Sequence, residues 1–199
     1  MTYLRPQITI HHGLPDHLRT QAALLYWQAF GGKLGRVLGP EPRALQYLTR
    51  VLRAENCLTA YDAHGTLIGL AGFKTQQGTF AGGSESDLRA IYGPAGGRWR
   101  AVILRLLNND SENDRFLLDG LCVSPGFRGQ GVGTALLEAI AAEGRARGFA
   151  AIRLDVVDTN ARARALYERT GFTIARTAGI GPLRYIFGFT AAHTMIRPL

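Results

Sequence analysis

The chain has 199 residues, 46% of them hydrophobic and 19% charged, a balance typical of a globular protein, and we expect a single domain over 1–199. The formal net charge of +8 admits nucleic acid, a membrane surface or an anionic small molecule as partner. The arginines are scattered, no 18-residue apolar stretch occurs and the start lacks a signal-peptide pattern, so we expect no nucleic acid, no membrane and a cytoplasmic location.

Apolar periodicity and turn residues predict the elements of the first half. In chain order these are a strand over 5–11, a helix from Pro15 to about Phe30, a loop over 30–42 with four glycines and two prolines, a second helix with Leu45, Leu48 and Leu52 on one face, strands over 58–62 and 66–73 joined at His64-Gly65, and a glycine-rich insertion or long loop over 76–97.

The second half alternates strands with single helices. The predicted elements are a helix containing Trp99, Val102, Ile103 and Leu106, a strand over 116–123, a turn over 124–126, a helix over 134–147, a strand over 151–157, a helix over 161–170, and strands over 172–177 and 185–196. This order indicates a mixed α/β or α+β sheet rather than a bundle or a sandwich. Trp99 and Tyr185 are interpreted as core residues.

The segment between the strand over 116–123 and the helix over 134–147 carries the clearest chemical signal. It reads Arg128-Gly129-Gln130-Gly131-Val132-Gly133, and it leads directly into the helix. A helix N-terminus offers unpaired N–H groups, glycines let a phosphate approach them, and an arginine adds a charged donor. A nucleoside-triphosphate loop needs Lys-Ser/Thr after its last glycine, whereas Thr134 follows here, and the glycine spacing differs from G-x-G-x-x-G.

The spacing R-x-x-G-x-G resembles the pyrophosphate loop of the GCN5-related N-acetyltransferase (GNAT) family. A second motif, Asn160-x-x-Ala163-x-x-Leu166-Tyr167-x-x-x-Gly171-Phe172, resembles the later helix and strand of that family. The resemblance is clearest over 116–177. It implies a central mixed, mostly antiparallel, twisted sheet flanked by helices, with the middle strands over 116–123 and 151–157 splayed apart so that acyl-CoA enters the gap.

The resemblance also implies the chemistry, which is direct attack of a primary amine on acetyl-CoA in a ternary complex. The residues expected to bind the cofactor are Leu121, Cys122, Val123, Arg128, Gly129, Gln130, Gly131, Val132, Gly133, Thr134, Asn160 and Tyr167. Tyr167 is the candidate acid, with a core tyrosine as the alternative, and Asn160 is equally interpreted as a plain helix N-cap. A backbone N–H near Leu121 or Cys122 is the candidate oxyanion donor.

Two carboxylates are candidates for the general base. Asp155 leads, because an acid within an apolar strand is expected to have a raised pKa, and Asp119 on the facing strand is second. For each, the alternative is a structural ion pair or a bond to backbone. Cys122 is not expected to be a nucleophile, since no histidine partner is apparent, and the histidines show no metal spacing.

Substrate recognition is assigned to the loops over 30–42 and 76–97, where specificity often resides. The candidate substrate residues are Phe30, Lys33, Arg36 and Arg184, and solvated surface charge is the competing interpretation of the three cations. The acceptor is a small-molecule or peptide amine. A non-catalytic acyl-CoA sensor of the same fold is the alternative function. The identity of the amine and the length of the acyl group stay open, and so does the oligomeric state, with which a homodimer is compatible.

Overall fold

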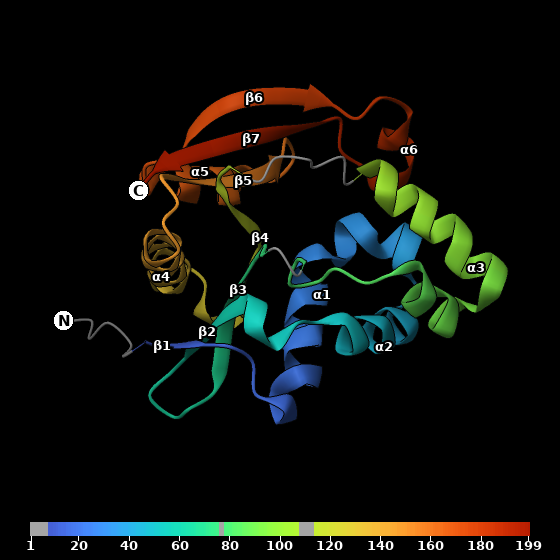
Figure 1. The fold of residues 1–199 in the computed structure, drawn as a ribbon, viewed down its shortest axis with the longest axis horizontal. Coiled ribbons are helices and arrows are strands. Elements are labelled where there is room, and N and C mark those ends of the chain that lie inside the picture. The colour runs from blue at the N-terminus through green and yellow to red at the C-terminus, as the bar shows by residue number, and fades with distance from the viewer. Residues whose placement is uncertain (1–7, 76–77, 108–113) are drawn as a thin grey trace.

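The computed structural model describes residues 8–75, 78–107 and 114–199, which form one seven-stranded sheet flanked by helices (Figure 1). The strands lie in the order β1 (Thr9–His12), β2 (Cys57–Tyr61), β3 (Leu67–Phe73), β4 (Phe116–Val123), β5 (Ala151–Val157), β7 (Ala191–Pro198) and β6 (Thr173–Gly179). All neighbours pair antiparallel except β4 and β5, which are parallel. The predicted mixed, mostly antiparallel sheet is therefore confirmed.

Helices cover both faces of this sheet. They are α1 (Arg19–Leu38), α2 (Glu41–Val51), α3 (Glu85–Leu107), α4 (Val132–Ala146), α5 (Ala161–Arg169) and the short α6 (Arg184–Phe187). One hydrophobic cluster joins α1, α2 and α3 to the sheet, and a second joins α4 and α5 to it. Figure 1 shows α1 to α3 on the right of the central strands and α4 on the left. The middle strands β4 and β5 thus lie between two helical layers.

Gly69 in β3 explains how closely α4 approaches the sheet. A Cβ atom on this glycine would stand 3.0 Å from Val132 and 3.1 Å from Leu136. Both side chains are fully buried, and burial of each contributes about 1.5–3 kcal/mol. Because Val132 is the first residue of α4, this packing fixes where the helix begins.

The loop predicted over 30–42 is wrong over most of its length, because α1 continues to Leu38. Gly31, Gly32 and Gly35 are helical here although glycine weakens a helix by roughly 0.5–1 kcal/mol relative to alanine. The burial of Val37 and Leu38 at the end of the helix offsets that cost. Tertiary packing has therefore overridden the local glycine signal.

The long loop predicted over 76–97 is also corrected, since α3 begins at Glu85. Residues 76 and 77 lie outside the described part of the chain. The helix is kinked at Gly93, whose φ of 75° breaks the helical path, and Pro94 follows directly. The glycine and proline therefore mark a bend between two helical halves.

Two further predictions differ from the structure near the C-terminus and on α3. The last strand begins at Ala191 instead of residue 185, because α6 occupies the preceding segment. Trp99 and Tyr185, interpreted as core residues, are 42% and 70% exposed. The periodicity of α3 predicts a helix correctly, but the apolar stripe that contains Trp99 faces solvent.

Candidate functional site

The middle of the sheet opens into a gap between β4 and β5. These strands pair only from Phe116 with Ile152 to Leu118 with Leu154, although both strands continue for several residues. Beyond that point β4 pairs with β3 alone and β5 with β7 alone. The splayed middle strands implied by the sequence resemblance are therefore confirmed.

The backbone of β4 presents alternate residues to this gap. Ser124, directly after β4, donates its N–H to the carbonyl of Ile68 in β3. Because antiparallel pairing alternates along a strand, the backbone groups of Cys122 also face β3, whereas those of Leu121 and Val123 face the gap. Backbone groups without a strand partner are ready donors and acceptors for a ligand amide.

The loop over 128–133 lies at the N-terminus of α4, next to the end of β4. Gly129 has φ 82°, and Gly131, the N-cap residue, has φ 90° without a side-chain cap. The Arg128 Nε donates to the carbonyl of Val123 at 3.1 Å, and the Gln130 amide donates to the carbonyl of Gly126 at 2.8 Å. These bonds tie the loop to the end of β4 and the turn after it. The N–H groups of the first turn of α4 have no acceptor within the helix, as at any helix N-terminus.

Tyr167 lies on α5 and is 8% exposed. Its ring centroid is 5.8 Å from that of Phe172, so the ring packs in the core of the α4 side. Burial, with a smaller contribution from the nearby Cys122 thiol, raises the pKa of Tyr167 well above its ordinary value. The side chain thus combines a packing role with a phenol that stays protonated. The Asn160 Oδ1 accepts the Ala163 N–H at 3.1 Å, which establishes Asn160 as the N-cap of α5.

Asp119 is the extra residue of a β-bulge in β4. Gly72 pairs with Gly120 and Phe73 pairs with Leu118, which leaves Asp119 unpaired and turns its side chain. The carboxylate accepts the Ala81 N–H at 3.3 Å. Burial raises the pKa of Asp119 in spite of opposing contributions from backbone donors and two lysines. The bulge therefore places an acid of raised pKa on the α1 side of β4.

Asp155 has a different environment from the apolar one expected. Its side chain is 41% exposed, and it pairs with Arg153 at 3.0 Å. The Thr194 hydroxyl on β7 donates to the same carboxylate at 2.5 Å. The neighbours Leu154 and Val156 are buried on the opposite face, because side chains alternate along a strand. The expectation of a desolvated carboxylate at this position is wrong.

Residues of α1 close the site from the other side of β4. The Phe30 ring stands 3.2 Å from where a Cβ of Gly120 would be, and it lies 4.5 Å from the Tyr26 ring. The Lys33 Nζ lies 4.9 Å from the centroid of the Phe30 ring. Sequence reasoning missed Tyr26, although its spacing of four residues from Phe30 places both on one helical face. Burial raises the pKa of Tyr26, with Asp119 the next cause.

The other two candidate substrate residues make contacts with α6. Arg36 donates to the backbone carbonyl of Tyr185, and Arg184 donates to the Tyr185 hydroxyl at 2.8 Å. The Arg184 guanidinium also lies 4.9 Å from the Tyr185 ring centroid. The first of these bonds ties the end of α1 to the connection between β6 and β7. A structural role for Arg36 is therefore established, and a role in binding substrate stays a prediction.

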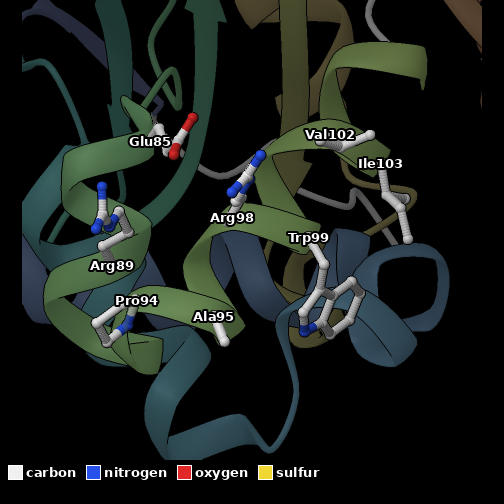
Figure 2. A pocket seen from close by; sticks show the side chains of 8 residues that line it. All are labelled: Glu85, Arg89, Pro94, Ala95, Arg98, Trp99, Val102 and Ile103. Atoms are coloured by element: carbon white, nitrogen blue, oxygen red, sulfur yellow. The ribbon is translucent and has the colours of Figure 1, made fainter.

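A separate pocket lies on α3 and draws none of its lining from β4 or β5. Its lining residues are Glu85, Arg89, Pro94, Ala95, Arg98, Trp99, Val102 and Ile103. Figure 2 shows them on the two halves of the kinked helix, with Pro94 and Ala95 at the bend. Among the described residues, no His, Cys, Asp and Glu side chains gather in threes to hold a metal ion, and no helix is long and apolar enough to cross a membrane.

Comparison with known proteins identifies the family. The acetyltransferase (GNAT) family model matches residues 22–172. The chain is 51% identical over 53 residues to a mycothiol acetyltransferase from Beutenbergia cavernae, which covers 27% of this chain and 18% of that protein. It is 44% identical over 62 residues to the ribosomal protein bS18-alanine N-acetyltransferase of Escherichia coli, which covers 31% of this chain and 42% of that protein. The matched regions span less than half the length of either curated relative.

The fold is similar to that of solved N-acetyltransferases. The structure of an N-acetyltransferase from Staphylococcus aureus Mu50 superposes with a TM-score of 0.68 over 94% of this chain and 99% of that chain, at 16% sequence identity. At this identity the likeness concerns the fold. The family match, by contrast, covers most of the sequence, including the loop over 128–133 and the helix that carries Tyr167. The chain belongs to the GNAT acetyltransferase family.

Proposed function

We propose that the protein transfers an acetyl group from acetyl-CoA to a primary amine by direct attack in a ternary complex. The observation that carries this proposal is the gap between β4 and β5, next to the glycine loop at the start of α4. The free edge of β4 and the uncapped helix N-terminus together suit a ligand with amide groups at one end and a pyrophosphate at the other.

The residues present fit acetyl-CoA. Gly131 has the left-handed backbone conformation that glycine adopts without strain, and open space surrounds its Cα, so a phosphate can approach the loop there. Arg128 and the first-turn N–H groups of Val132, Gly133 and Thr134 would hold the pyrophosphate. The backbone of Leu121 and the N–H of Val123 would pair with the pantetheine amides. Acetyl-CoA would supply the activated acyl group as a thioester, and the protein would supply the groups that transfer protons and stabilise charge.

Three groups of the protein would handle proton and charge. The Leu121 N–H, which faces the gap, is the proposed oxyanion donor, because the amide of Cys122 faces β3. The Tyr167 hydroxyl would give a proton to the leaving thiolate. Cys122 would stay a buried thiol, since burial raises its pKa well above the ordinary value.

Asp119 replaces Asp155 as the proposed general base. An acid of raised pKa accepts a proton from an ammonium more readily than an ordinary carboxylate, and Asp119 has that property. Asp155 is committed to Arg153 and Thr194. The proton would pass to Asp119 directly or through one water.

The acceptor would approach from the side of α1 and α6. Phe30 and Lys33 lie nearest to β4 there, and we propose that they contact the acceptor. One relative is named for an alanine of ribosomal protein bS18 and the other for mycothiol, so we propose peptide and small-molecule amines as the two candidate acceptor classes. The free, buried cysteines Cys57 and Cys122 suit the cytoplasm, which we propose as the location.

The deciding experiment is calorimetric titration with acetyl-CoA, followed by a thiol-release screen over peptide α-amines and small-molecule amines. Binding together with release by one amine class supports the proposal and identifies the acceptor. Binding without release by any amine would favour the acyl-CoA sensor. Absence of binding would refute both functions.

A further inference from the structure

Lysine is almost absent from this basic chain. The sequence contains 23 lysines and arginines together, and only Lys33 and Lys74 are lysines. Both interact electrostatically with Asp119, the proposed general base. Both side-chain amines of lysine in the protein therefore contribute to the electrostatic environment of the same carboxylate.

Lys33 has the surroundings of a reactive amine. It is half-buried on α1, and its Nζ lies over the Phe30 ring, which itself rests against Gly120 of β4. No ion pair joins Lys33 to another described residue. Burial lowers the pKa of Lys33, although Cys122 and Asp119 oppose this shift, so more of the amine is neutral than in water. A neutral amine near a base is the state that attacks a carbonyl.

Lys74 also interacts with Asp119, but its surroundings differ from those of Lys33. It follows β3 directly, and its backbone N–H donates to the carbonyl of Leu117 at 3.0 Å. This residue also takes part in another interaction within the protein. It lies next to the paired part of β4, whereas Lys33 interacts with Cys122 in the open part.

We propose that Lys33 is an acyl acceptor within the protein itself, so that the chain acetylates its own Lys33 when an acetyl thioester lies along the free edge of β4. This inference rests on the proposed binding of acetyl-CoA in the gap. The Nζ lone pair forms a bond to the thioester carbonyl carbon, and the carbon–sulfur bond breaks. The proton lost by Nζ passes to Asp119, the Tyr167 hydroxyl gives a proton to the departing thiolate, and water then carries the proton from Asp119 back to Tyr167. The products are an acetylated lysine and a free thiol.

The test is mass spectrometry of the purified protein after incubation with acetyl-CoA and no added amine. We expect a gain of one acetyl group, located at Lys33 by peptide mapping, at a rate that does not depend on protein concentration. Acetylation of Lys33 should exceed that of Lys74 by at least about tenfold, because proximity within a complex raises the effective concentration. K33R should abolish the modification, and K74R should leave it unchanged.

A second measurement needs no acetyl-CoA. Trace labelling with acetic anhydride over a pH series should give half-maximal reactivity of Lys33 at a lower pH in the folded protein than in the urea-unfolded protein. An equal or higher pH would contradict the proposal, since the folded site would not favour the neutral amine.

Calorimetric titration with acetyl-CoA distinguishes failure of self-acetylation at Lys33 from failure of the proposed function. If acetyl-CoA binds but Lys33 stays unmodified, or if Lys74 is modified equally fast, self-acetylation at Lys33 is refuted and the proposed function is untouched. If acetyl-CoA does not bind, both proposals fail together.

Discussion

The side chain of Phe80 lies directly over Gly72 of β3, and its Cβ stands 2.5 Å from the position that a Cβ of Gly72 would take. Phe80 is completely buried, and the next residue, Ala81, donates its N–H to Asp119. A glycine at this point of the sheet therefore allows the segment around Phe80 to approach and hold the proposed base.

We expect Gly72→Ala to destabilise the protein by about 1–3 kcal/mol, because the added methyl group overlaps Phe80 and an overpacked core must shift. Denaturant unfolding measures this. The matched control is Gly32→Ala on α1, where no atom lies within 4 Å of an added Cβ, and which should stabilise by about 0.5–1 kcal/mol. Equal stability of Gly72→Ala and the native protein would contradict the close approach.

Gly131→Ala should weaken acetyl-CoA binding by about tenfold, equivalent to about 1.4 kcal/mol. A non-glycine residue at φ 90° is strained, and the loop must change shape around the proposed anion site. Gly148→Ala, after the other end of α4, has a φ of 80° and open space and serves as the control. Calorimetry should show unchanged affinity for Gly148→Ala, and a loss of affinity in both variants would assign the effect to general strain.

Tyr167→Phe should lower kcat by about 10²-fold while acetyl-CoA affinity is kept, because only the proposed proton donor is removed. The ring still packs on Phe172, so the unfolding midpoint should change little. Since burial raises the pKa of Tyr167, the native phenol stays protonated over the assay range and the pH–rate profile should keep its shape. Tyr61→Phe in β2 is the control, and a native rate in Tyr167→Phe would refute the acid role.

Asp119→Asn should reduce turnover and flatten the rise of rate with pH. Burial raises the pKa of Asp119, so in the native protein the carboxyl group loses its proton, and becomes a base, only above its ordinary range. Asp155→Asn should leave the profile unaltered, because that carboxylate is exposed and paired with Arg153. The reverse result would restore Asp155 as the base.

Asp119→Asn should also change how the free energy of unfolding depends on pH. A carboxyl group whose pKa is raised on folding binds more protons in the native state than in the unfolded state between the two pKa values. The free energy of unfolding of the native protein should therefore fall as pH rises through that window, and Asp119→Asn should lack this fall. Urea unfolding at several pH values measures the difference, and parallel curves would contradict a raised pKa.

Local signals in the sequence predicted the central half of the sheet well. The strands over 116–123 and 151–157 have the predicted bounds, because runs of apolar residues end at turn residues in both cases. The Asn160 cap was predicted because asparagine side chains accept from the free N–H groups of a first helical turn. In the loop before α4, Gly129 and Gly131 have the left-handed backbone conformation that glycine favours.

Contacts between distant segments decided where α1 ends and what surrounds Asp155. The three glycines from Gly31 to Gly35 favour a loop locally, yet the burial of Val37 and Leu38 keeps α1 helical. Leu154 and Val156 suggest an apolar setting for Asp155, but strand alternation turns it toward Thr194, a partner 39 residues away.

By itself the sequence determined the family motifs, the order of elements and the residue types available for chemistry, because these depend on neighbours along the chain. Only the tertiary structure decided that Asp119, on a bulge, holds the desolvated acid and that the half-buried Lys33 interacts electrostatically with it. Desolvation and proximity are properties of the packed chain, since both depend on which distant segments exclude water from a group.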